Sequence, residues 1–150
     1  MRRGLLAAAL LVAAWAVGFA GPALAADPAT NKKIVIDFYE KALNQKDFEA
    51  AARHFGPRYI QHNPLVPDGP EGLQRLVALL KEKFPNSKSE IKRAIAEGDL
   101  VVLHVHSTRE PGQRGRAIVD IFRRENGKIV EHWDVIQDVP ETAANTNTMF

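Results

Sequence analysis

The spacing of hydrophobic residues changes near residue 87. Before that point, apolar side chains recur every three or four positions, which is typical of one buried helix face. This spacing predicts three helices, over residues 30–43, 47–55 and 70–84. After it, apolar and polar residues alternate, which is typical of strands. The alternation predicts four strands, over residues 89–97, 100–108, 116–124 and 128–137.

The predicted helix boundaries coincide with residues that favour helix ends. Thr30 or Asn31 can cap the first helix, and Asp47 can cap the second, which Gly56-Pro57 then ends. Pro70 suits the first turn of the third helix.

Tight turns join the predicted strands. Gly98-Asp99 suits one of them, and Asn126-Gly127 is a strong hairpin signal. Segment 59–64 is expected to be short and partly extended, and Met149 and Phe150 are expected to fold back onto the domain. Helices followed by a strand meander define an α+β class, in which three N-terminal helices pack on one face of a curved antiparallel sheet.

The first 25 residues have the composition of a secretory signal peptide. Arg2-Arg3 gives a positive start, residues 5–19 are almost wholly apolar, and Ala23-Leu24-Ala25 is a small-x-small cleavage pattern. We therefore expect cleavage after Ala25, a periplasmic or secreted location and one domain over residues 26–150. An uncleaved membrane anchor is the alternative, although a membrane span needs about 20 apolar residues.

The charge of the chain depends on this segment. It contains two of the 20 Lys and Arg residues and none of the 18 Asp and Glu residues, so the remainder carries 18 charges of each sign. A neutral domain gives no reason to expect nucleic acid or an anionic membrane as partner. The chain has no cysteine, which excludes a thiol nucleophile, a Cys-ligated zinc site and an iron–sulfur cluster.

Several titratable residues interrupt the apolar strands: His104, His106, Asp120, His132 and Asp134. Asp134, between Trp133 and Val135, is expected to be partly desolvated, which raises the pKa of a carboxyl group and suits a proton shuttle. The alternative is a structural carboxylate that pairs with an arginine or caps a backbone group. His132 is interpreted as a strand-edge residue, and His54 as a helix-surface residue.

Two other places offer candidate polar chemistry. His62 and Asn63 lie just before a proline, where side chains can point into the mouth of a pocket or belong to an ordinary solvated turn. His104 and His106 are two residues apart on one strand face, so both can ligate a metal, and His62 with Asp134 would complete the set. A histidine pair without a metal is the alternative.

Both faces of the predicted sheet are rather apolar, whereas a sheet with one face in water alternates more cleanly. Helices can cover only the concave face. We therefore expect a homodimer formed through the convex face.

Two segments, together with the order of the elements, carry a family resemblance. They are Tyr59-Ile60-Gln61-His62-Asn63-Pro64 and Gly127-Lys128-Ile129-Val130-Glu131-His132-Trp133-Asp134. With three helices followed by a meander, the chain resembles the SnoaL-like polyketide cyclase branch of the nuclear transport factor 2-like superfamily, and within it the SnoaL-like aldol-condensation proteins. The resemblance covers essentially the whole mature chain. It implies a cone, in which a curved sheet wraps around three helices and a deep pocket, and commonly a dimer.

The resemblance also implies site residues. Polyketide cyclases, ketosteroid isomerase and limonene epoxide hydrolase are relatives that move a proton with a pocket carboxylate or histidine. The last-strand carboxylate falls on Asp134, and the polar pair that lines the pocket falls on Gln61 and Asn63. His104 and His106 occupy positions that are Arg and Asp in the epoxide hydrolase, which argues against epoxide hydrolysis by the same residues.

We therefore expect proton transfer next to a carbonyl of a small, mostly apolar molecule, leading to aldol-type cyclisation, isomerisation or dehydration without an organic cofactor or metal. The catalytic candidates are Asp134, His62 and His104. The substrate-binding candidates are Gln61, Asn63, His106, Asp120, Tyr39 and Trp133. The alternatives are a non-catalytic periplasmic binding protein with the same pocket, and a metal-dependent enzyme that uses His104 and His106.

Overall fold

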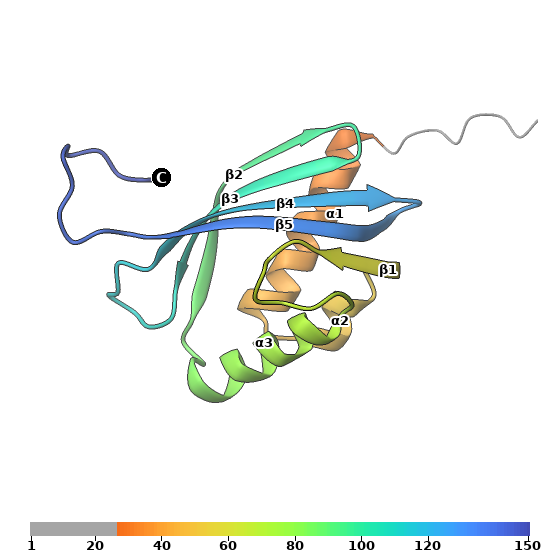
Figure 1. Ribbon diagram of the computed structural model, residues 1–150, viewed down its shortest axis with the longest axis horizontal. Helices are drawn as coiled ribbons and strands as arrows, with labels where there is room; N and C mark the ends of the chain where they lie inside the picture. Colours follow the sequence, from red (N-terminus) through yellow and green to blue (C-terminus); the bar gives the residue numbers. More distant parts are fainter. Residues whose placement is uncertain (1–26) are drawn as a thin grey trace, which may run out of the picture.

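Figure 1 shows the computed structural model, which describes residues 27–150. The predicted signal peptide therefore lies outside the described residues. The helical elements are α1 (Pro28–Tyr39), a π-helical turn η1 (Glu40–Asn44), α2 (Phe48–Ala52) and α3 (Glu71–Lys83). The strands are β1 (Phe55–Gln61), β2 (Lys88–Glu97), β3 (Leu100–Thr108), β4 (Arg116–Glu125) and β5 (Lys128–Asp138). Within the described range, no helix has the length and hydropathy that a membrane crossing requires.

The α+β class and the curved, unclosed sheet are confirmed. The sheet has five strands in the order β1-β5-β4-β3-β2. Strands β2 to β5 form the antiparallel meander that the alternation predicts. The helices lie on one face of this sheet, and the last residues of the chain loop back toward β2 and β3 (Figure 1).

The prediction of a four-stranded sheet is wrong at β1. This strand pairs in parallel with β5, and Phe55 lies opposite Ile129. The spacing of Phe48, Ala51 and Phe55 fits a helix, but α2 ends at Ala52 and Phe55 begins the strand. At Gly56 the strands approach so closely that a Cβ atom would lie 2.8 Å from the Val130 side chain.

The N-terminal cap of α1 also differs from the prediction. Asp27 caps the helix by accepting a hydrogen bond from the Thr30 N–H at 3.1 Å. Pro28 occupies the first helical position, where its missing N–H costs nothing. Asn31 is instead buried, where it donates to the Gly98 carbonyl at 2.9 Å and accepts from Arg124.

The core shows which strand faces point inward. Val35, Phe38 and Tyr39 of α1 pack in one buried cluster with the inward side chains of β3. Those β3 residues are Val101, Leu103 and Val105, each fully buried. Side chains alternate along a strand, so His104 and His106 point to the opposite, convex face.

Candidate functional site

A cavity of about 830 Å³ lies between the helices and the inner face of the sheet. This volume lies in the range of roughly 300–1,000 Å³ that is typical of small-molecule sites. Its wall is largely apolar and includes Phe38, Leu43, Val66, Leu73, Leu76 and Ile118. Leu65, which also lines it, is 90% exposed and belongs to the loop between β1 and α3. The cavity therefore suits a mostly apolar molecule.

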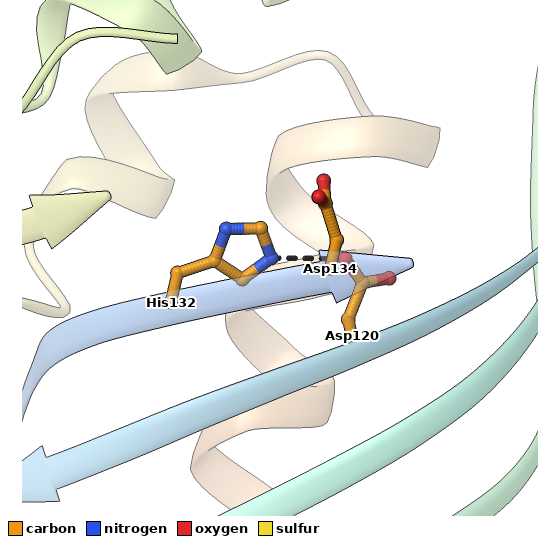
Figure 2. A group of neighbouring side chains, drawn as sticks. All are labelled: Asp120, His132 and Asp134. Atoms are coloured by element: carbon orange, nitrogen blue, oxygen red, sulfur yellow. Dashed lines mark hydrogen bonds and ion pairs between the residues drawn. The ribbon is translucent and has the colours of Figure 1, made fainter. Parts of the chain in front are cut away.

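Three titratable side chains meet on this wall. Asp120 of β4 and His132 and Asp134 of β5 all line the cavity, and candidate ligand atoms of the three lie within 4.8 Å of one another. Asp120 lies directly opposite Asp134 in the register of the two strands. Figure 2 shows the three side chains converging on the same side of the sheet.

Asp120 is the buried centre of this group, with 5% of its surface exposed. Its Oδ2 accepts a hydrogen bond from the Tyr39 hydroxyl at 2.8 Å, and its Oδ1 lies 2.9 Å from His132 Nε2 (Figure 2). Burial raises the pKa of Tyr39 well above its ordinary value, and the charge of Asp120 raises it further. Tyr39 therefore remains a hydrogen-bond donor.

The hydrogen bonds of His132 determine how many protons the group holds. Gln61 Oε1 accepts from the Asn63 backbone N–H at 3.1 Å, which fixes the orientation of the Gln61 amide. The same oxygen lies 2.8 Å from His132 Nδ1. Because an amide oxygen only accepts, Nδ1 carries a hydrogen. Nε2 faces a carboxylate, so Asp120 and His132 together share one further proton.

Asp134 is the more open carboxylate of the pair. Asn63 Nδ2 lies 3.0 Å and 2.7 Å from its two oxygens, while Asn63 Oδ1 accepts from the Leu65 N–H at 2.9 Å. The Leu65 bond orients the Asn63 amide, so its donor group faces Asp134. Asp134 is half-buried and lines the cavity. Its carboxylate is therefore placed against whatever the cavity holds.

The same three residues are a candidate metal-ligand set. Within residues 27–150, Asp120, His132 and Asp134 form the group whose ligand atoms are close enough to share an ion, and His104 and His106 belong to no such group. One histidine and two carboxylates suit a divalent metal. Such an ion would have to replace the direct contact between Asp120 and His132. The metal alternative built on His104 and His106 is therefore not supported by their positions.

Four of the residues expected at the site do not line the cavity. Trp133 alternates with His132 and Asp134, so its side chain lies on the outer face, where His62 stacks on it at 4.6 Å. His62 also pairs with Glu131 at 2.8 Å. His104 Nδ1 lies 2.8 Å from Arg93 Nη1, and His106 packs against Phe150 with ring centroids 4.3 Å apart. The three histidines therefore do not meet Asp134 in one cavity: strand alternation places His104 and His106 on the outer face, and His62, just after β1, stacks on Trp133 there.

The contact of Phe150 with His106 confirms that the end of the chain folds back. Lys92 also lies over the Phe150 ring, at 5.7 Å from its centroid. The aromatic residue therefore covers part of β2 and β3 on the outer face.

His132 is the site residue that the sequence interpretation missed. It is 8% exposed, and its ring stacks on Phe122 with centroids 4.6 Å apart. The strand-edge interpretation is wrong because β1 pairs along the otherwise free edge of β5, so β5 is an internal strand of the sheet. The alternation that places His132 and Asp134 on one face was the signal that could have identified it.

The cavity is lined by the other five residues that the sequence predicts at the site: Asp120, Asp134, Gln61, Asn63 and Tyr39.

The interpretation of His54 as a helix-surface residue also needs correction. It lies 3.0 Å from Asp37, and its ring packs edge-on against Phe38.

Solved structures with this fold come from several bacteria. AclR, a candidate hydroxylase from Streptomyces galilaeus, has a TM-score of 0.63 and 24% identity over 74% of this chain and 91% of its own. A candidate polyketide cyclase from Acidithiobacillus ferrooxidans has a TM-score of 0.58 and 19% identity over 71% and 87%. A candidate ketosteroid isomerase from Kribbella flavida has a TM-score of 0.63 and 14% identity over 79% and 86%. At these identities the likeness shows the shared nuclear transport factor 2-like fold.

The family itself follows from the sequence. No functionally curated protein is significantly similar to the chain. The sequence model of the SnoaL-like polyketide cyclase family matches residues 33–144, which include most of α1, the other helices, the whole sheet and Asp120, His132 and Asp134. The chain therefore belongs to the SnoaL-like polyketide cyclase family.

Proposed function

We propose that the protein catalyses proton transfer next to a carbonyl group of a small, mostly apolar molecule. The observation that carries this proposal is a half-buried carboxylate, Asp134, that lines the cavity beside a buried, directly contacting pair, Asp120 and His132. The family membership supports a catalytic or ligand-binding role for the cavity. The reaction is cyclisation, isomerisation or dehydration through an enolate.

In this proposal Asp134 is the general base. Its carboxylate removes the proton from the carbon next to the substrate carbonyl. It later returns the proton to the product in cyclisation or isomerisation, or gives it to the departing hydroxide in dehydration, which releases water. Asn63 holds both oxygens of Asp134 and so fixes the direction of the carboxylate. A positioned acid–base group of this kind accelerates a reaction by about 10²–10⁴-fold.

Gln61 supplies the donor for the developing oxyanion. Its oxygen is held by the Asn63 N–H and by His132 Nδ1, while its Nε2 amide group hydrogen-bonds to the Tyr59 side chain. Gln61 and Tyr59 both line the cavity, so the second N–H of the Gln61 amide can point to the substrate oxygen. The Tyr39–Asp120–His132 chain positions Gln61 through a continuous set of buried hydrogen bonds. A pre-oriented donor stabilises an oxyanion without reorganisation during the reaction.

Substitution of Asp134 tests the proposal. The assay is solvent deuterium exchange into small ketones, followed by NMR. We expect Asp134→Asn to reduce exchange by about 10²-fold or more, while Asp99→Asn, in an exposed turn, leaves it unchanged. Equal exchange rates for the wild type and Asp134→Asn would remove Asp134 from the mechanism.

Non-catalytic ligand binding is a second candidate function. It is favoured by one observation: both His132 nitrogens and both Asp120 oxygens already have partners within the protein. A ligand that binds in the cavity and shows no deuterium exchange, isomerisation or dehydration would support this alternative.

We also propose that the mature protein acts outside the cytoplasm as a homodimer. The signal-like composition of residues 1–25 supports export. The outer face of the sheet supports the dimer, because Val119 and Val135 lie opposite one another there and are 37% and 71% exposed. N-terminal sequencing of exported protein should begin at Ala26. Light scattering should give twice the monomer mass for the wild type and the monomer mass for Val135→Glu.

A further inference from the structure

Three arginines line one end of the cavity: Arg109, Arg114 and Arg116. Arg116 and Asp120 point to the same face of β4 and are four residues apart, which corresponds to about 13 Å along a strand. Arg109 follows the end of β3, whose last inward residue, Ser107, pairs with Arg116. The arginines therefore lie at the opposite end of the cavity from Asp134.

The three guanidinium groups differ in their partners. Arg116 Nε lies 3.0 Å from Asp138 Oδ1, which neutralises it. Arg114 reaches Glu141 only at 3.9 Å, between two largely exposed side chains, and such pairs are weak. Arg109 has no ion pair within residues 27–150; its guanidinium lies over the Phe84 ring at 5.3 Å from the centroid.

Arg109 is also held in an environment that disfavours its charge. Burial lowers its pKa, and the nearby charge of Arg116 lowers it further. An arginine nevertheless remains protonated in proteins. A half-buried cation without an ion pair among residues 27–150 is best compensated by an anion that the cavity receives.

The segment that carries these arginines is fixed in place. The Arg114 carbonyl accepts a hydrogen bond from His106 Nε2 at 2.7 Å, and the Gly115 carbonyl accepts from the Val139 N–H at 3.0 Å. Gly115 has φ +73°, and a Cβ atom there would lie 2.3 Å from the Ser107 carbonyl oxygen. These contacts hold the end of the loop against the ends of β3 and β5 and so fix the backbone next to Arg114 and Arg116.

We propose that Arg109, assisted by Arg114, forms an anion subsite, and that the substrate is an apolar carbonyl compound that carries a carboxylate or a similar anionic group. This inference rests on the proposed function, since it takes Asp134 to mark the reacting end. The substrate carboxylate binds the planar Arg109 fork, which donates a hydrogen bond to each of the two oxygens at once. Its apolar middle lies along Leu73, Leu76 and Ile118; its carbonyl oxygen reaches Gln61, and the carbon next to the carbonyl reaches Asp134. The negative charge of Asp134 disfavours the reverse orientation.

A pair of matched probes tests the subsite. We use 9-oxodecanoate, a flexible methyl ketone with a carboxylate at its other end, and its uncharged methyl ester. We expect calorimetry to show that the wild type binds the acid at least about tenfold more tightly than the ester. Arg109→Gln should lose this preference, and Arg109→Lys should keep part of it. Arg75→Gln, which removes the same charge from an exposed position on α3 outside the cavity, should keep all of it.

The possible failures are distinguishable. Equal affinity for acid and ester in the wild type, an unchanged preference in Arg109→Gln, or no binding of either probe would overturn the subsite. Deuterium exchange at the carbons beside the ketone is measured in the same samples. Selective binding of the acid without deuterium exchange supports the subsite and removes the catalytic proposal. Deuterium exchange without a preference for the acid supports the catalytic proposal and removes the subsite.

Discussion

Substitution of Asp120 tests whether hydrogen bonding or charge holds the buried cluster together. Asp120→Ala leaves the Tyr39 hydroxyl and His132 Nε2 without their shared partner in a region where all three residues are buried. Each buried polar group that loses its partner costs about 1–3 kcal/mol. The expected loss in the free energy of unfolding is therefore about 2–6 kcal/mol, a large share of the roughly 5–15 kcal/mol that a domain of this size possesses.

Asp120→Asn should behave very differently. The asparagine oxygen can accept from the Tyr39 hydroxyl, and its amide group can donate to His132 Nε2, provided that this nitrogen carries no hydrogen. His132 Nδ1 then still donates to Gln61. All the hydrogen bonds remain and one proton is lost, so the free energy of unfolding should fall by only about 1 kcal/mol.

Urea denaturation measures both free energies, and ¹⁵N NMR of His132 reports the hydrogens on its ring. In the wild type the spectrum should show Nδ1 protonated and Nε2 sharing a proton with Asp120, whereas in Asp120→Asn the Nε2 signal should be that of an unprotonated nitrogen. If Asp120→Asn is destabilised as much as Asp120→Ala, the hydrogen-bond assignment is refuted, and the negative charge itself holds the cluster.

Two further predictions concern the loop and the outer face. A left-handed backbone conformation costs a non-glycine residue about 1–2 kcal/mol. Gly115→Ala should lower the free energy of unfolding by more than this, because its Cβ atom would also clash with the Ser107 carbonyl oxygen. Gly112→Ala, at φ +82° with no atom within 4 Å, is the matched control in urea denaturation, and equal losses for the two variants would contradict the close approach at Gly115. The hydrogen bond from His62 holds the pKa of Glu131 below its ordinary value of 4.5. Because the folded pKa is the lower one, this pair stabilises the protein above pH 4.5 and the stabilisation is lost as the pH falls through the folded pKa. Glu131→Gln should therefore show a smaller drop in the free energy of unfolding between pH 6 and pH 3, and an unchanged drop would refute the pairing.

Local signals were sufficient for most of the elements. The predicted third strand segment, 116–124, and β4 (Arg116–Glu125) differ by a single residue, and β3 (Leu100–Thr108) has the predicted bounds. Tight turns at Gly98 and at Asn126-Gly127 fix these strands through neighbouring residues, since both glycines have positive φ. Pairing between neighbouring strands of a meander needs no long-range information.

The choice of the inner face was harder to make. Along β3 both faces are apolar, and only packing against α1 decides that Val101 and Leu103 point inward while His104 points outward. The alternation separated the two sets correctly, but it could not say which set meets the helices. The sequence therefore predicts Asp134 and His104 in one pocket, whereas in the structure they lie on opposite faces of the sheet.

A single missed strand explains the error at His132. Parallel pairing of β1 with β5 joins segments that are about 70 residues apart, as the 71-residue separation of Gln61 and His132 shows. No local pattern reports such a contact, and Phe55 fits the preceding helix by spacing alone. Without β1, β5 is an edge strand and His132 is an exposed histidine. With β1 in place, Gln61 comes within reach of His132 Nδ1, and the ring must satisfy both Gln61 and Asp120. The pairing of β1 with β5 therefore buries the Asp120–His132 pair and supplies the Gln61 acceptor that fixes the hydrogen on His132 Nδ1, while Gly56 leaves room for the Val130 side chain where β1 begins.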